Sequence, residues 1–483
     1  MNLTGASIRA AVVEQKERTR HCSKAEIERF IEESESKIIS LESQICALQE
    51  LRDHQRACVL ALKHILSPIH SLPVELLAEI FHFTLRDNPN IKDMCRVSHV
   101  CSDWRQLAHS TPRLWTRFPS IDLYRDGNVP DHIIALLARS APLSIRISFE
   151  SRSGPGEKAI NSGILEMLRA SSRWSSLDLS FMNTTQPPLL EQLAQYRFDS
   201  LEEMELGLIT DTQSTPPPAF IVPRLRKLSI SNLTGQAPQI VIPWAQLTEL
   251  TLEFDCRDGT LEVLSQCTNL VKADITILEW SQSPEVGQEL IHFSRLQSLE
   301  LRLWADSAVF FDCVSAPVLQ ELRLDLHEQS WDPPTDIPWT AAHITAFQLR
   351  TPNLTRLEFN SSDALMITSD NLVAAIRSAP SLTHLNLNCR NNCVDDAFIR
   401  TLHYEDGVPP LVPRLHNLVI DGTQVLTENV VVGMIASRWW EDTELVPPSI
   451  SRWTHLELKV RCNWTRPLSE IREDYHMPSD AIL

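Results

Sequence analysis

A short leucine pattern, L-x-x-L-x-L, recurs along the C-terminal part of the chain and constrains its fold more than any other feature. Most units follow one another at intervals of 22 to 28 residues, and three late joints are wider. Each unit is long enough for one strand with two apolar side chains on the same face. The units begin at Trp174, Leu201, Leu225, Leu247, Leu270, Leu296, Leu319, Leu354, Leu382, Leu415 and Trp453.

Helical patterns separate these units, for example at residues 131–142, 163–172 and 370–380. Five units are introduced by Pro-x-Leu, and proline there stops a preceding helix and favours an extended approach to a strand. Leu143, Ile145 and Ile147 predict the first strand. Strand, turn and helix, repeated, predict an α/β fold: a curved solenoid with parallel strands inside and helices outside. A doubly wound α/β domain is the alternative, but it does not explain one recurring motif.

The period and core of these units resemble leucine-rich repeats. The unit from Leu382 is most similar, with Asn388 or Cys389 near the position where the family carries Asn or Cys. Most other units lack that Asn, so the side-chain ladder that ties the repeats is degenerate. The resemblance implies a leucine-rich-repeat solenoid over residues 121–483.

A second feature is the stretch from Ser71 to Trp115, whose apolar residues recur at helical spacing. A first run follows Pro73 and ends at the turn-forming residues 87–90, and a second run extends from Met94 to Ala108. Thr111-Pro112 closes the second run, and Trp115 follows as an aromatic anchor. The stretch predicts a compact group of short helices.

These residues resemble an F-box: LPxELLxxIF, then V-x-x-V-C-x-x-W-R-x-L-A, then P-x-L-W. The resemblance implies a three-helix F-box over residues 67–120 that docks on the Skp-type adaptor of an SCF ubiquitin ligase. The linker RDNPNIKDM is longer than the usual connection. A helical hairpin that only packs on the rest of the chain is the alternative. The adaptor-facing residues that the resemblance implies are Leu72, Pro73, Glu75, Leu76, Ile80, Phe81, Val100, Cys101, Trp104 and Leu107.

Residues 1–66 are predicted to form a helical arm, with one helical pattern from about residue 8 to residue 66. In a heptad frame, Ile38, Leu41, Ile45 and Leu48 form an apolar seam, which Arg52 and Gln55 interrupt. The seam is consistent with a coiled coil or a helical hairpin, or with a single solvated helix that lies back on the F-box. A coiled coil through residues 24–66 would allow a homodimer.

Charges that flank the inward leucines are expected on the concave face, because strand side chains alternate. Twelve of these positions are acidic and six are basic. One hypothesis is that this face recruits a substrate protein with a basic segment; the other is that solvated strands of an acidic protein are acidic everywhere. The candidate substrate-binding residues are Glu203, Glu205, Glu249, Glu253, Asp274 and Glu300.

Composition and motifs exclude several functions. A net charge of −18 argues against binding nucleic acid or an anionic membrane. There is no G-x-S-x-G, G-x-x-x-x-G-K or H-E-x-x-H sequence, so we expect no enzyme, metal site or cofactor. No signal peptide or membrane span is expected, and the eleven cysteines are scattered. These features predict a location in the cytoplasm, the nucleus or both.

The two resemblances together imply the substrate-recognition subunit of an SCF-type ubiquitin ligase, with an unknown protein substrate. The alternative is a non-catalytic scaffold whose F-box-like helices only cap the solenoid, since a solenoid needs a polar cap at each end.

Overall fold

The chain divides into two compact units, Met1–Thr84 and Leu85–Leu483, in a computed structural model. Each unit is described by itself. The structure describes residues 5–84, 91–118, 120–122, 129–150, 162–180, 187–207, 217–233, 240–254, 257–277, 290–304, 310–327, 341–361, 368–389, 393–439, 446–447 and 449–462.

The first unit is helical throughout. It comprises α1 (Gly5–Arg18), α2 (Lys24–Ile65), the 3₁₀ helix η1 (Pro68–Ser71) and α3 (Val74–Thr84). The expected continuous helical pattern is interrupted at residues 19–23, where Ser23 begins a new helix. The Ser23 hydroxyl and backbone N–H both donate to Glu26 Oε2, at 2.9 and 2.7 Å, which satisfies an otherwise unpaired donor at the helix start.

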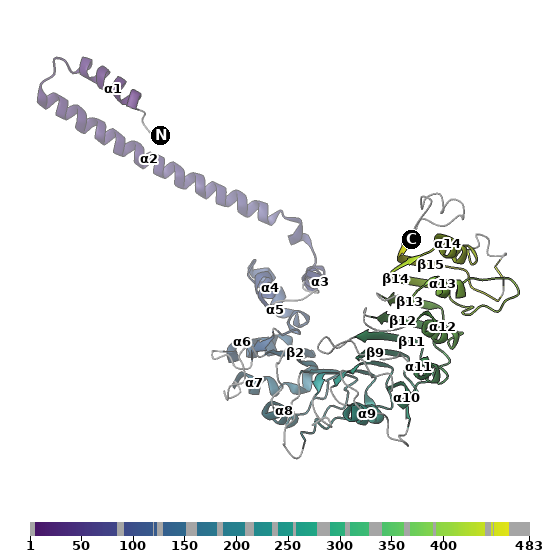
Figure 1. Ribbon diagram of the computed structural model, residues 1–483. Helices are drawn as coiled ribbons and strands as arrows, with labels where there is room; N and C mark the ends of the chain where they lie inside the picture. Colours follow the sequence, from purple (N-terminus) through teal and green to yellow (C-terminus); the bar gives the residue numbers. More distant parts are fainter. Residues whose placement is uncertain are drawn as a thin grey trace, which may run out of the picture. The chain divides into compact units, whose positions relative to one another are not determined.

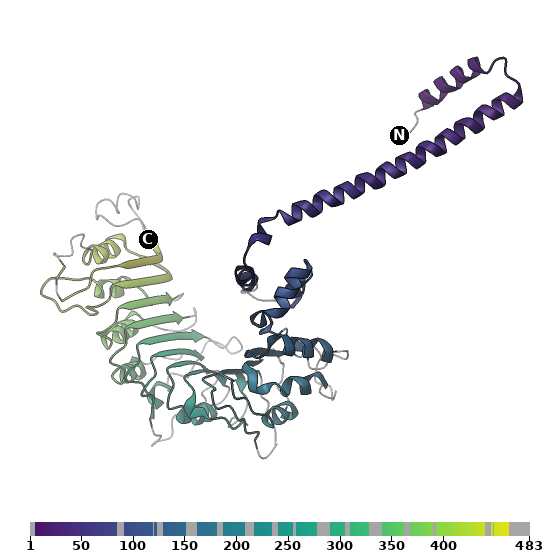
Figure 2. The same ribbon diagram turned by 180° about the vertical axis from the view of Figure 1, so that it is seen from behind.

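Figures 1 and 2 show α2 as one long continuous helix. Nearly all of its described side chains are exposed. The four residues of the predicted apolar seam are 53 to 65% exposed. Helices in water are stabilised mainly by packing an apolar face, so an uncovered seam of this length is unusual.

The second unit begins with three short helical elements: α4 (Ile91–Ser98), α5 (Ser102–Ser110) and the 3₁₀ helix η2 (Pro112–Trp115). The single amphipathic run expected from Met94 to Ala108 is therefore two helices. The break follows from Cys101, whose backbone is extended and whose Sγ accepts a 3.5 Å hydrogen bond from the backbone N–H of Trp104. Together with α3 of the first unit, three α-helices form the segment, as predicted.

A parallel sheet of 13 strands forms the body of the second unit, and neighbouring strands follow almost strictly in chain order. Every strand predicted from the leucine pattern is present. One short strand, β1, precedes the one that we expected to be first; it has only two residues and carries no repeat pattern. The strands are β1 (Ile121–Asp122), β2 (Ile145–Glu150), β3 (Trp174–Leu179), β4 (Glu203–Leu206), β5 (Lys227–Leu233), β6 (Glu249–Phe254), β7 (Lys272–Ile277), β9 (Ser298–Trp304), β11 (Glu321–His327), β12 (Arg356–Ser361), β13 (His384–Cys389), β14 (Asn417–Leu426) and β15 (His455–Cys462).

The pairing register aligns the leucines of successive repeats into columns. Leu299 pairs with Leu322, which pairs with Leu357, and all three are buried. The first leucine of each unit precedes its strand and is also buried, as at Leu225 and Leu247. This stacking forms one continuous core that no single repeat could bury alone.

Backbone hydrogen bonds tie the repeats together at the position after that first leucine. The N–H of Thr248 donates to Arg226 O, that of Val271 to Thr248 O and that of Gln297 to Val271 O, each at 2.8 Å. The column continues through Gln320 as far as Thr454. A backbone column of this kind satisfies the polar groups between repeats whose side-chain ladder is degenerate.

Helices follow most of the strands, and Figures 1 and 2 show α10 to α14 along one face of the sheet. The second unit is therefore a leucine-rich-repeat-like solenoid, as its sequence predicts. Its helices are α6 (Val129–Ser140), α7 (Ser162–Leu168), α8 (Pro187–Ala194), α9 (Arg257–Gln266), α10 (Phe310–Cys313), α11 (Ala341–Gln348), α12 (Ser369–Arg377), α13 (Asp396–Thr401) and α14 (Glu428–Ala436).

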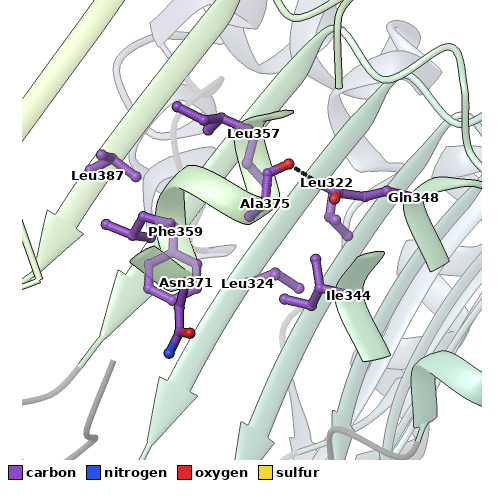
Figure 3. Close-up of a pocket in the computed structure, with 11 residues that line it drawn as sticks. Leu322, Leu324, Ile344, Gln348, Leu357, Phe359, Asn371, Ala375 and Leu387 are labelled. Atoms are coloured by element: carbon purple, nitrogen blue, oxygen red, sulfur yellow. Dashed lines mark hydrogen bonds between the residues drawn. The ribbon is translucent and has the colours of Figure 1, made fainter. Parts of the chain in front are cut away.

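A small apolar pocket lies between the sheet and this helical layer (Figure 3). Leucines and Phe359 of β11 to β13 line one side, and residues of α11 and α12 line the other. Gln348 Nε2 donates a 2.6 Å hydrogen bond to Ala375 O across the two helices. The pocket is part of the repeat core, and its lining carries no group of catalytic type.

Candidate functional site

On α3, the predicted adaptor-facing residues separate into an exposed and a buried group. Leu76 and Ile80 are 54% and 41% exposed, and Pro73 and Glu75 are also exposed. Leu72 is half-buried. Phe81 differs, because it is only 2% exposed and belongs to the core.

The sequence pattern also missed two exposed apolar residues of α3, Val74 and Phe83, each 59% exposed. The buried Leu77 and Phe81 are four residues apart and share one helical face. Val74 lies seven residues before Phe81 and close to that face, so its exposure does not follow from its helical position.

On the second unit, the remaining predicted residues surround the start of α5. Val100 is 55% exposed, and Cys101, Trp104 and Leu107 are half-buried. Cys101 has a structural role as the cap of α5, which the sequence pattern did not reveal. Val100 and the partly exposed Trp104 and Leu107 are therefore apolar groups of this region that a partner could cover.

Trp115 connects this helical segment to the solenoid. Its indole Nε1 donates a 2.7 Å hydrogen bond to Ala108 O at the end of α5, and its side chain is 2% exposed. The guanidinium of Arg139 on α6 lies 4.7 Å from the ring centroid, and the His109 ring lies 5.8 Å away. Burial, together with Arg139 and Arg105, lowers the pKa of His109, which favours a neutral imidazole beside two cations.

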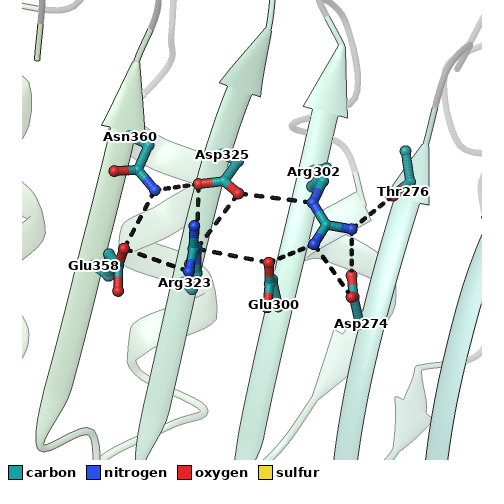
Figure 4. A network of polar contacts seen from close by, with 8 residues as sticks. All are labelled: Asp274, Thr276, Glu300, Arg302, Arg323, Asp325, Glu358 and Asn360. Carbon is teal, nitrogen blue, oxygen red and sulfur yellow. Dashed lines mark hydrogen bonds and ion pairs between the residues drawn. The ribbon is translucent and has the colours of Figure 1, made fainter. Parts of the chain in front are cut away.

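The concave-face candidates Asp274 and Glu300 lie in a network of ion pairs (Figure 4). Arg302 contacts Asp274 at 2.9 Å and Glu300 at 2.6 Å. Arg323 on the next strand lies 3.6 Å from Glu300 and 3.4 Å from Asp325. Burial raises the pKa of Asp274, against the opposing charge of Arg302. Asp274 and Glu300 already pair with Arg302, so they offer a basic partner less negative charge than we expected.

The network extends across four strands. Arg323 also lies 3.6 Å from Glu358, and Asn360 donates to Asp325 and to Glu358. Because the two arginines stand between the carboxylates of neighbouring strands, they compensate part of the negative charge of the four carboxylates in the middle of the concave face.

Glu203 and Glu205 lie in a different environment. In the register of β3 to β5, Glu205 pairs with Asp178, and Glu203 pairs with Lys227. Burial raises the pKa of Glu205, and the neighbouring carboxylate of Asp178 raises it further. At this end of the concave face, the carboxylates of Asp178, Glu203 and Glu205 carry more negative charge than Lys227 compensates.

Glu249 and Glu253 lie on β6. Glu249 is exposed and pairs in register with Lys227 on one side and Lys272 on the other, whereas Glu253 is half-buried. Of the six candidate residues, the structure thus brings Asp274 and Glu300 into one network and places the other four on β4 and β6.

Among the residues that the structure describes, no three His, Cys, Asp or Glu side chains gather closely enough to hold a metal ion. Cys389 and Cys393 are buried, and their contact raises the pKa of Cys389. No described helix is both long and apolar enough to cross a membrane.

Comparison with known proteins assigns the helical segment. Residues 69–118 match the F-box-like family. No curated protein matches the chain. The crystal structure of the TLR13–ssRNA13 complex is similar to this chain at a TM-score of 0.33 and 12% sequence identity. That similarity covers 72% of this chain and 53% of the other, so the chain spans about half the length of that protein. Residues 69–118 therefore form an F-box-like domain. The solenoid that follows is defined by the order of its own parallel strands.

Proposed function

We propose that this protein is the substrate-recognition subunit of an SCF-type ubiquitin ligase. The F-box-like domain docks on a Skp-type adaptor, and the solenoid holds a substrate protein near the ubiquitin-conjugating enzyme. The F-box-like match at residues 69–118 is the observation that carries this proposal. The role needs no bond chemistry from this chain, because proximity raises the effective concentration of the substrate.

The exposure of the apolar side chains on α3 supports adaptor docking. Leu76 and Ile80 are exposed apolar residues at positions where the F-box pattern expects a partner. Burying what remains exposed of each side chain at an interface contributes on the order of 1 kcal/mol. Val100 and Trp104 are the residues proposed for the same role on the second unit, and Phe81 supports α3 as a core residue. The proposed domain limits remain 1–66, 67–120 and 121–483.

Co-expression with a Skp-type adaptor tests the proposal. The full chain should co-purify with the adaptor, and a chain with Leu76→Glu and Ile80→Glu should not. Val408→Glu is a matched control, because Val408 is 54% exposed in a distant repeat and should leave capture unchanged. Equal capture by all three chains would refute the assignment of these residues.

A scaffold without adaptor binding is the second candidate. The burial of Trp115 against Arg139 favours it, since η2 and α5 then serve as the cap of the solenoid. Failure of the unmodified chain to capture any Skp-type adaptor would support the scaffold and contradict the ligase proposal. The cytoplasmic or nuclear location and the homodimer through residues 24–66 remain predictions.

A further inference from the structure

We propose that α2 pairs with α2 of a second copy of this chain in an antiparallel coiled coil. Its apolar a and d side chains are exposed from Ile31 (51%) to Leu62 (60%), with Ser34, Arg52 and Gln55 as polar interruptions. An exposed apolar stripe of this length indicates an interaction surface. The proposal concerns the arm alone and goes beyond the proposed ligase function.

The first helix of the unit is too short to cover this seam. α1 has 14 residues and α2 has 42. At 1.5 Å per residue, these are about 21 and about 63 Å long. Ile8 and Val12 of α1 are themselves exposed, at 49% and 59%. A partner of equal length is needed, and a second α2 meets that requirement.

The charge pattern selects the antiparallel orientation. Residues 24–45 contain six acidic and three basic side chains, whereas residues 46–66 contain two acidic and three basic side chains. An antiparallel pair sets the acidic half of each helix against the basic half of the other. A parallel pair sets like halves together.

The register with the longest overlap that still pairs a with d positions covers residues 27–66. With Ile45 opposite Leu48 of the second copy, Ile31 lies opposite Leu62 and Ile27 opposite Leu66. All of these are a or d positions.

In that register, the flanking e positions face one another with opposite charge. Glu28 faces Lys63 of the second copy, and Glu35 faces Arg56. The two-fold symmetry of the dimer repeats both pairs, so there are four attractive contacts. A register shifted by one heptad toward the amino terminus would place Glu42 opposite Glu42 of the second copy and would separate Glu28 from Lys63.

Arg52 gives an independent reason for the antiparallel orientation. It occupies an a position, where a parallel, in-register dimer would set Arg52 against Arg52 in the centre of the seam. In the antiparallel register, Arg52 lies opposite Leu41, and its charged end can reach water beside the seam. Gln55 likewise lies opposite Ile38, not against a second Gln55.

The antiparallel arm sets the distance between the two ends of α2 that lead into η1 and α3. Each α2 ends at Ile65, just before η1 and α3 of the same unit. Overlap of residues 27–66 places these two ends about 60 Å apart, at opposite ends of the coiled coil. A parallel arm would bring them together.

Charge exchange on the full-length protein tests the pairing. Sedimentation should show a dimer for the unmodified chain. One variant carries Glu28→Lys and Glu35→Lys, and a second carries Arg56→Glu and Lys63→Glu. Each alone should raise the dimer dissociation constant on the order of a hundredfold, because four contacts become repulsive. An equimolar mixture of the two should form a heterodimer. Glu32→Lys with Glu50→Lys is the control, since it makes the same charge change outside the seam.

Disulfide trapping tests the orientation, in a chain whose Cys22, Cys46 and Cys58 are replaced by serine. Ile31→Cys chains mixed with Leu62→Cys chains should cross-link, whereas Ile31→Cys chains alone should not. A monomeric unmodified chain, undiminished dimers of both charge variants, or self-cross-linking of Ile31→Cys would each overturn the proposal. These readouts use no adaptor, so they are separate from the capture experiment on Leu76 and Ile80.

Discussion

The guanidinium of Arg139 lies over the indole ring of Trp115, 4.7 Å from its centroid, and joins the F-box-like segment to the first helix of the solenoid. Trp115→Ala should lower the stability of the second unit by about 3 to 5 kcal/mol, because it removes a buried aromatic side chain and leaves a cavity. Arg139→Ala should cost about 0.5 to 2 kcal/mol, the range for a partly desolvated cation–π contact. Thermal denaturation of the full chain measures both.

Trp104 provides the matched comparison. It is half-buried at the start of α5, and we propose it for adaptor binding. Trp104→Ala should weaken adaptor capture with a smaller loss of stability than Trp115→Ala. Similar losses of stability in the two variants would show that Trp104 is a core residue and not part of a docking surface.

Arg302 should stabilise the sheet through the carboxylates that it separates. Arg302→Met leaves Asp274 and Glu300 without this cation, and should cost about 1 to 3 kcal/mol. Asp274→Asn in that background should recover part of the loss, because one of the unpaired charges is gone. Urea denaturation of the two single variants and the double variant gives the coupling free energy between Arg302 and Asp274. Simple additivity of the two changes would contradict the network.

Recruitment of a basic segment should depend on β4 and β6 and not on the network. Replacing Glu203, Glu205, Glu249 and Glu253 with Lys should abolish capture of a basic partner, by reversing the local charge. Asp274→Asn with Glu300→Gln should change capture little, because both carboxylates already pair with Arg302, and Glu300 also with Arg323. Binding of a lysine-rich peptide, measured by fluorescence anisotropy at two salt concentrations, separates the two outcomes. Unchanged binding by the fourfold variant would exclude this surface.

Glu205 should make the stability of the solenoid depend on pH. Its pKa is raised, so the folded state holds the proton more tightly than the unfolded chain does. The ionised Glu205 side chain therefore destabilises the folded state at neutral pH. This destabilisation decreases as the pH falls through the raised pKa toward the ordinary 4.5. Glu205→Gln should raise stability at pH 7 by less than about 1 kcal/mol, since water still screens the group. The gain should vanish at pH 4; a gain that is independent of pH would contradict this explanation.

Much of the solenoid was predictable, because the leucine pattern of each repeat predicts one strand. The leucines of L-x-x-L-x-L identify every strand of the 13-stranded sheet from β3 onward, since their spacing must match a parallel register. Ile145 and Ile147 identify β2. The two-residue strands β8 (Ile291–His292) and β10 (Val314–Ser315), which pair with each other, carry no such pattern. β1 could not be found, because two residues carry no period. The break at residues 19–23 was missed because heptad counting ignores the Ser23–Glu26 cap.

The candidate site was less predictable, since exposure and pairing depend on neighbours that are distant in the sequence. Phe81 belongs to the same helical pattern as Ile80, yet one is buried and the other exposed. Asp274 and Arg302 are 28 residues apart, and only the strand register brings them together. A list of charges on a face therefore overstates the charge that a partner would meet.

The nearly uninterrupted order of the parallel strands makes the solenoid a molecular ruler. Neighbouring strands lie about 4.8 Å apart, so deleting one complete repeat between β7 and β12 would shift β14 and β15 by roughly one such step relative to α5. The number of repeats then sets the distance between a molecule held at the C-terminal strands and the F-box-like helices of the same unit. The identity of any one side chain matters less for this distance. Variation in length at these joints would change this distance while leaving α4, α5 and the C-terminal strands unchanged.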